Sequence, residues 1–93
     1  MKRLSIRFSS KFKKDYKLAT KQHQNISELF EVIDKLADRM ALEPKYKDHS
    51  LSGKYTDCRE CHISPDFLLI YRVYDEELVL LLLRAGSHSD LFK

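Results

Sequence analysis

The strongest constraint on the fold is an unbroken apolar run at residues 78–83, which reads Leu-Val-Leu-Leu-Leu-Leu. Six residues are far too few for a membrane-spanning helix, which needs about 20. A short apolar run bounded by turn residues is typical of a strand that is covered on both faces. Here Asp75-Glu76-Glu77 precedes the run and Gly86 follows it. The run therefore predicts a central strand with other structure packed on both sides.

The rest of the chain predicts three more strands and two helices. Leu4, Ile6 and Phe8 alternate with polar residues, as in a strand with one polar face. Residues 57–64 and 67–74 predict two further strands around a Pro-Asp turn. Between the first and second strands, apolar stripes predict one helix from Ser10 to about Gln22 and another that starts after Asn25 and reaches Met40. The intervening residues 41–56 are expected to form a loop.

The element order is therefore β-α-α-β-β-β. We expect one α+β domain spanning residues 1–93, with an antiparallel sheet and the two N-terminal helices packed on one of its faces. The basic N-terminus lacks the long apolar segment of a signal peptide, and no segment is long enough to cross a membrane. Cys58 and Cys61 are expected to be two free thiols, which suits a cytoplasmic protein.

Positive charge is concentrated near the N-terminus. Residues 1–24 contain eight Lys and Arg residues and a single acid, Asp15, whereas the whole chain carries a net charge of only +3. Such an excess of cations attracts polyanions by steering and by counterion release. We therefore expect Lys11, Lys14 and Lys17 to contact nucleic acid, and the alternative is that they form a solvated helix face.

Three of the four histidines lie in short polar segments beside expected strands, at His49, His62 and His88. In a meander of the three C-terminal strands, the first and the third end at the same side of the sheet. Topology then gathers His62, His88 and Asp66 there, and Arg84 can point toward the same end. His49 has to be delivered by the long loop, and the fourth histidine is expected to be a surface residue between the helices.

These groups suit metal-free cleavage of RNA. When the 2′-OH attacks the adjacent phosphorus, one group must accept its proton, a second must protonate the leaving 5′-oxygen, and a cation must stabilise the phosphorane. Histidine exchanges protons near neutrality. No carboxylate cluster suits Mg²⁺, and the single Cys58-x-x-Cys61 pair lacks the second half of a zinc site. We therefore expect no metal and no cofactor.

Longer motifs of the chain resemble the YafQ branch of the RelE/ParE superfamily of bacterial toxin–antitoxin toxins. Three segments in fixed order carry the resemblance: residues 46–53 (YKDHSLSG), 59–71 (RECHISPDFLLIY) and 84–92 (RAGSHSDLF). The basic start with Phe12-Lys13-Lys14-Asp15 also fits. Where the better-known YafQ pattern has Trp after Pro-Asp, this chain has Phe67, which can also stack on a base.

The resemblance implies a RelE-like fold and a ribosome-dependent endoribonuclease that cuts mRNA in the A site of the 30S subunit. It implies that His49, His62, Asp66 and His88 form the catalytic set, and it leaves open which histidine is the acid and which the base. Further partners are implied as well: a cognate ribbon-helix-helix antitoxin in a heterotetramer, and operator DNA bound only through that antitoxin. Two residues are implied to act on the substrate: Arg84 near the scissile phosphate, and Phe92 as an aromatic that positions it.

Two other functions remain open from the residues. A ParE-like toxin that binds a topoisomerase would share the scaffold but would not need three histidines at one end of the sheet. A non-catalytic RNA-binding or ribosome-binding module would need only the basic first helix. Loss of cleavage with retained ribosome binding, after substitution of the histidines, distinguishes the enzyme from both.

Overall fold

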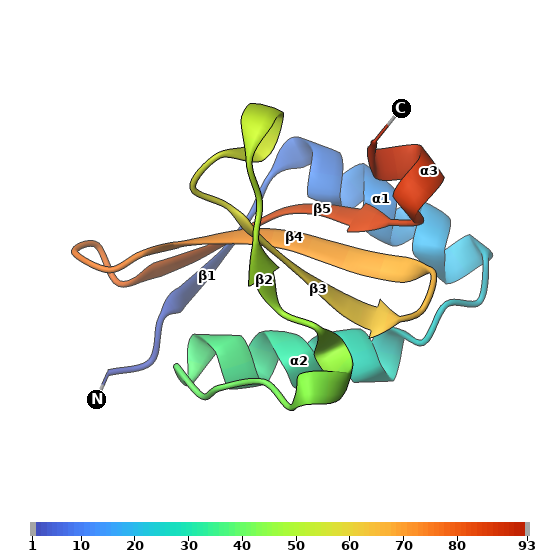
Figure 1. Cartoon of the computed structure of the whole chain (residues 1–93). Coiled ribbons are helices and arrows are strands. Elements are labelled where there is room, and N and C mark those ends of the chain that lie inside the picture. The colour runs from blue at the N-terminus through green and yellow to red at the C-terminus, as the bar shows by residue number, and fades with distance from the viewer. Residues whose placement is uncertain (1, 93) are drawn as a thin grey trace.

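The computed structural model describes residues 2–92, and it confirms the predicted α+β fold (Figure 1). Its five-stranded sheet has the order β1-β5-β4-β3-β2. The strands are β1 (Ser5–Phe8), β2 (His49–Ser50), β3 (Arg59–Ser64), β4 (Phe67–Tyr74) and β5 (Val79–Gly86). The helices are α1 (Ser10–Lys21), α2 (Ile26–Ala37) and the one-turn α3 (His88–Leu91), with 3₁₀ turns η1 (Pro44–Tyr46) and η2 (Gly53–Tyr55).

Both long helices begin where the sequence places their caps. The Ser9 hydroxyl accepts a hydrogen bond from the amide of Phe12, and the Asn25 side chain accepts one from the amide of Glu28. The end of α2 differs from the expectation. Arg39 adopts a left-handed conformation with φ of 61°, which ends the helix before Met40. Met40, which was expected on the buried face, is therefore 56% exposed.

The three C-terminal strands form the predicted antiparallel meander, but β1 is parallel to β5. The sheet is therefore mixed, and the expectation of a purely antiparallel sheet is wrong for this one pair. The reason lies in the connection: β1 reaches β5 through helices α1 and α2 and three further strands, so no short hairpin fixes its direction. The two-residue strand β2, which pairs antiparallel with β3, was not predicted because it is too short to show a period.

The two faces of the sheet are covered unequally. Helices α1 and α2 pack on one face, where Leu80 and Leu82 of β5 are completely buried in the main core. On the other face a smaller cluster joins Leu68 and Ile70 of β4 to Leu91 of α3, and the η2 segment packs against it. In Figure 1, α3 and the loop with η2 lie on one side of the sheet and α2 lies on the other. The predicted strand at residues 78–83 thus has full cover on one face and partial cover on the second.

Within residues 2–92, no helix combines the length and the hydropathy that a bilayer crossing requires. Cys58 and Cys61 are both buried free thiols. Burial raises the pKa of the Cys61 thiol to about 12, so this thiol stays neutral near physiological pH. The prediction of two free thiols is therefore confirmed.

Candidate active site

The strand order brings His62 and His88 to the same end of the sheet, as the predicted meander requires. His62 on β3 is paired with Leu68 on β4, and Leu68 is paired in turn with Gly86 at the end of β5. Because neighbouring strands are about 4.8 Å apart, His62 and the end of β5 are separated by about 10 Å across the sheet. His88 opens α3 two residues after Gly86. The same end of the sheet therefore holds both histidines.

The structure also brings His49 to this place. His49 is paired with Glu60 across β2 and β3, and its ring lies 6.1 Å, centroid to centroid, from the ring of His62. His49 Nε2 is 3.0 Å from Glu60 Oε2, and His49 Nδ1 is 2.6 Å from the carbonyl oxygen of Lys47. Both ring nitrogens of His49 thus face oxygen acceptors, which fixes the orientation of a side chain that is 47% exposed.

A polar anchor in the core holds the loop that delivers His49. The hydroxyl of Tyr71 on β4 donates a 2.6 Å hydrogen bond to the carboxylate of Asp48, and Arg59 Nε donates a longer one of 3.3 Å to the same oxygen. Burial, and then the bond to Asp48, raise the pKa of Tyr71, so its hydroxyl remains a donor. Lys47 adopts a left-handed φ of 49°, which turns its carbonyl toward the ring of His49. The loop is therefore fixed directly before this histidine.

His88 belongs to a second, aromatic part of the site. Its ring lies 4.7 Å from the ring of Phe92, and Phe92 contacts Tyr55 of η2 edge to face at 5.9 Å. Phe92 is 39% exposed, so part of its ring is free to stack on a base. The expected positioning residue therefore lies directly beside the expected catalytic histidine.

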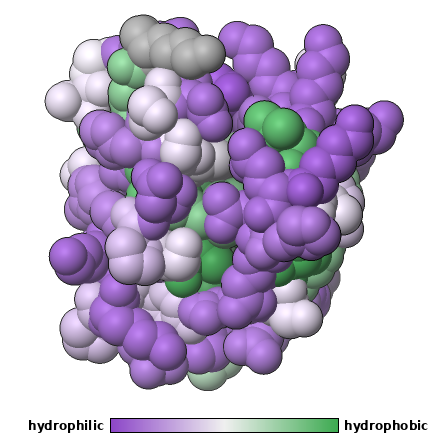
Figure 2. Space-filling view, turned by 90° about the vertical axis from the view of Figure 1, so that its right-hand side faces the viewer, coloured by the Kyte–Doolittle hydropathy of each residue, from purple (hydrophilic) through white to green (hydrophobic). Residues whose placement is uncertain are grey.

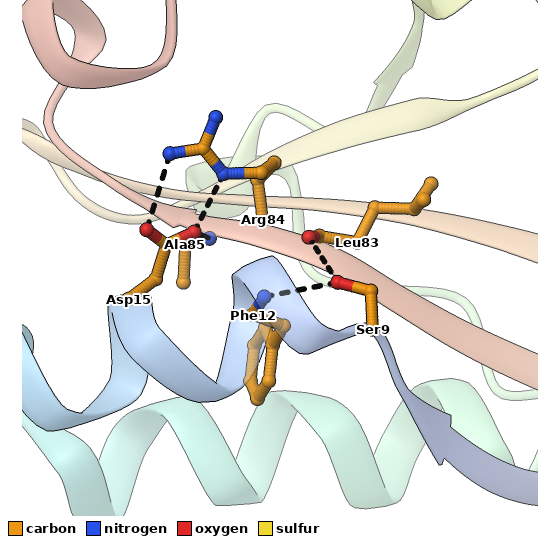
Figure 3. Close-up of polar contacts among 6 residues, drawn as sticks. All are labelled: Ser9, Phe12, Asp15, Leu83, Arg84 and Ala85. Atoms are coloured by element: carbon orange, nitrogen blue, oxygen red, sulfur yellow. Dashed lines mark hydrogen bonds and ion pairs between the residues drawn. The ribbon is translucent and has the colours of Figure 1, made fainter.

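Arg84 is held in a bidentate ion pair (Figure 3). Its Nε and Nη2 lie 2.7 and 3.1 Å from the carboxylate of Asp15 on α1, and this hydrogen bonding raises the pKa of Arg84. The same carboxylate accepts the backbone amide of Ala85 at 3.0 Å. Nη1 makes no bond to Asp15.

Asp66 and the three lysines are less constrained. Asp66 lies exposed in the turn between β3 and β4, and among residues 2–92 its carboxylate forms no hydrogen bond or ion pair. Lys11, Lys14 and Lys17 are exposed along α1. The structure thus leaves Asp66 at the predicted end of the sheet but does not join it to a histidine.

A pocket of 360 Å³ opens at the end of β3. Its lining includes Lys45, Tyr46 and Lys47, together with Glu28 of α2 and His62. The face of the molecule at this end is mostly hydrophilic, with hydrophobic residues showing between the polar side chains (Figure 2). The pocket thus places two lysines and one acid beside His62.

Sequence reasoning missed Glu60, the most deeply buried acid of the site. Glu60 is 4% exposed, and its Oε1 has no hydrogen-bond partner among residues 2–92. The available signal was its spacing from His62, since residues two apart on a strand share a face. Tyr55 was also missed, because its role depends on a contact with the distant Phe92.

Comparison with known proteins agrees with the resemblance found in the sequence. Residues 4–93 match the family described as the bacterial toxin of type II toxin–antitoxin systems, YafQ. The chain is 36% identical over 88 residues to the mRNA interferase toxin YafQ of Escherichia coli K12, with 94% of each chain covered. A metal-bound toxin from Helicobacter pylori is 47% identical, with a TM-score of 0.90 over 96% of this chain and 99% of the other. YafQ in the E. coli DinJ–YafQ toxin–antitoxin complex is 35% identical, with a TM-score of 0.88 over 98% and 99%.

Proposed function

Because this chain belongs to the YafQ family of type II toxin–antitoxin toxins, we propose that it is an mRNA interferase that cleaves mRNA in the ribosomal A site. The observation that supports this best is the pair His49 and His62, side by side at the end of the sheet that also carries His88. Proton exchange by neighbouring imidazoles is what a metal-independent attack by the 2′-OH requires.

The proposed reaction uses the residues in distinct roles. The 2′-oxygen forms a bond to phosphorus, the bond from phosphorus to the 5′-oxygen breaks, and the products are a 2′,3′-cyclic phosphate and a free 5′-OH. The ring of His49 is oriented by Glu60 and the Lys47 carbonyl, and we assign it the protonation of the leaving oxygen. His62 or His88 accepts the 2′-OH proton. Arg84 Nη1 stabilises the phosphorane, and Phe92 stacks on a base.

The openness of this site supports the proposed dependence on the ribosome. His49, Asp66 and Phe92 are all exposed, and no wall of the described chain closes over them. A shallow site positions a flexible RNA poorly, and effective molarity is lost when the 2′-OH is not in line with the leaving oxygen. In this proposal the ribosome supplies the missing alignment, which places the action of the toxin in the cytoplasm.

The test is cleavage of mRNA on purified programmed ribosomes. We expect His62→Ala and His88→Ala each to lower the rate at least 100-fold, because a placed acid or base contributes about 10²–10⁴-fold. Both variants should still sediment with ribosomes. His23→Ala, a change in the exposed helix connection, serves as the control and should cut normally. Cleavage by the His62→Ala/His88→Ala double variant would contradict the catalytic assignment, and binding without cleavage by the unsubstituted protein would favour a non-catalytic module.

We also propose a ribbon-helix-helix antitoxin as the partner, in a heterotetramer that binds operator DNA only through the antitoxin. An antitoxin is part of the solved E. coli complex to which this chain is similar. Co-purification of the toxin with the product of the adjacent small gene tests the partner, and scattering mass gives the stoichiometry. Operator binding by the toxin alone would contradict this assignment.

A further inference from the structure

Asp15 on α1 receives hydrogen bonds from two neighbouring residues of β5 (Figure 3). Its Oδ2 atom accepts Arg84 Nε at 2.7 Å and the backbone amide of Ala85 at 3.0 Å, while Oδ1 accepts Arg84 Nη2 at 3.1 Å. The side chain of Asp15 is only 13% exposed. One nearly buried carboxylate therefore holds both a cationic side chain and a backbone group of the same strand.

The surroundings of Asp15 in the sequence show that this contact is selective. Asp15 is the single acid among residues 1–24, in a helix rich in lysine. An acid that supports its own helix pairs with a cation three or four residues away, and Lys11 lies at that distance. The ion pair that Asp15 forms within residues 2–92 is nevertheless the one with Arg84. The acid thus serves the junction with β5 and not the surface of α1.

The junction lies directly before the part of the chain that carries His88. Two residues separate Ala85 from His88, which opens α3. Strand β1 gives no support here, because its pairing with β5 ends at Leu82. Asp15 therefore supplies the hydrogen-bond partner on this side of β5, next to the expected catalytic end.

Arg84 has room to leave its present position. A cavity of about 180 Å³ between α1, β5 and α3 is lined by Asp15, Arg84 and a second acid, Asp90. Within residues 2–92, Arg84 forms no ion pair with Asp90. A bidentate pair fixes the plane of a guanidinium, which a long and flexible arginine side chain does not do alone. The pair with Asp15 therefore orients Arg84 before any RNA is bound.

We propose that Asp15 is a positioning residue of the RNA-cleavage site, which holds the Arg84 guanidinium in the place from which it stabilises the phosphorane. The inference rests on the function proposed above. Asp15 stays ionised throughout and exchanges no proton with the RNA. Because it acts on the chemical step and adds no contact to the substrate, its loss should lower the maximal rate and leave binding nearly unchanged.

Single-turnover cleavage of mRNA on programmed ribosomes, at increasing toxin concentration, separates the maximal rate from the half-saturating concentration. Asp15→Asn removes the charge that holds Arg84, while the amide oxygen can still accept from Ala85. We expect the maximal rate to fall roughly tenfold, and the half-saturating concentration to change by less than about twofold. Asp34→Asn, the same change in an exposed pair with Arg3, is the matched control and should cut normally.

A double variant tests whether Asp15 acts through Arg84. Arg84→Gln removes the guanidinium, so the addition of Asp15→Asn should slow cleavage by less than about twofold further. Losses that add in the double variant would mean that Asp15 has only a structural role, and so would a loss of rate that is matched by a loss of binding. Either result would overturn the inference, as would an unchanged rate for Asp15→Asn.

Circular dichroism at the assay temperature checks that each variant is folded. If Asp15→Asn is not, Asp15→Glu takes its place, because it keeps the charge and moves the carboxylate by one methylene. We then expect a maximal rate about threefold lower at unchanged half-saturation, and a full rate would overturn the inference. Absence of cleavage by the unsubstituted protein is seen before any variant is compared, and it would overturn the proposed function and this inference with it.

Discussion

The Tyr71 hydroxyl is the residue-scale contact on which the position of His49 depends. Tyr71 is 2% exposed and lies in the main core, so its hydroxyl needs a partner there. That partner is Asp48, the residue directly before His49 in the chain. A core tyrosine thereby fixes a catalytic candidate that is itself exposed.

Removal of this hydroxyl should loosen the loop. We expect Tyr71→Phe to lower the free energy of unfolding by about 1–2 kcal/mol, because the buried carboxylate of Asp48 loses its shortest hydrogen bond. The rate of mRNA cleavage by this variant should fall as well. Tyr74→Phe is the control, since the ring of Tyr74 packs beneath Arg72 and is only partly buried. Urea denaturation measures both variants, and equal stability of the two would show that the Asp48 bond contributes nothing.

At the scale of elements, α1 completes an edge of the sheet that β1 leaves open. The pairing of β1 with β5 stops at Phe8 and Leu82, so the amide of Ala85 has no strand partner. Helix α1 follows β1 along this edge, and Asp15 accepts that amide while it pairs with Arg84 (Figure 3). Ser9, the N-cap of α1, adds a further bond between this helix and β5, because its hydroxyl donates to the carbonyl of Leu83.

Asp15→Asn should therefore weaken the junction between α1 and β5. The side chains of Asp15 and Arg84 are only 13% and 19% exposed, so the unpaired guanidinium is poorly solvated. We expect the free energy of unfolding to fall by about 1–3 kcal/mol. Glu43→Gln, which breaks an exposed ion pair with Lys35, should cost much less. Thermal or urea unfolding compares the two, and an equal effect would mean that burial of the Asp15 pair is unimportant.

At the scale of the whole molecule, the basic N-terminal part and the histidine site lie on a single small body. Helix α1 packs along β5, and its Asp15 pairs with Arg84 near the end of that strand. A polyanion bound at this end of the sheet is therefore near the cations of α1. This arrangement favours rapid association with ribosomal RNA.

Neutralisation of Lys11, Lys14 and Lys17 to Gln should weaken ribosome association. If all three contact phosphates, the slope of log affinity against log salt should fall by roughly two. The control variant replaces Lys2, Lys35 and Lys21, which lies at the C-terminal end of α1, by Gln and so removes the same total charge. Sedimentation binding at several salt concentrations gives both slopes. Identical behaviour of the two triple variants would show that only net charge matters.

Much of the fold was predictable, because local patterns carry it. The periods of β1, α1 and α2, the caps Ser9 and Asn25, and the meander order can all be read from short windows of sequence. Within the site, His62 and His88 were placed by that same order. The direction of β1 was not predictable because its partner β5 is distant in the sequence, and β2 was not because two residues show no period.

The sequence by itself determined to which end of the sheet His62 and His88 belong, because strands joined by short turns run in alternate directions. Only the tertiary structure decided how those groups are held. It paired His49 with Glu60 across β2, tied Asp48 to Tyr71 and bound Arg84 to Asp15. Each of these contacts joins segments that are separate in the chain, and no local period encodes the distance between them.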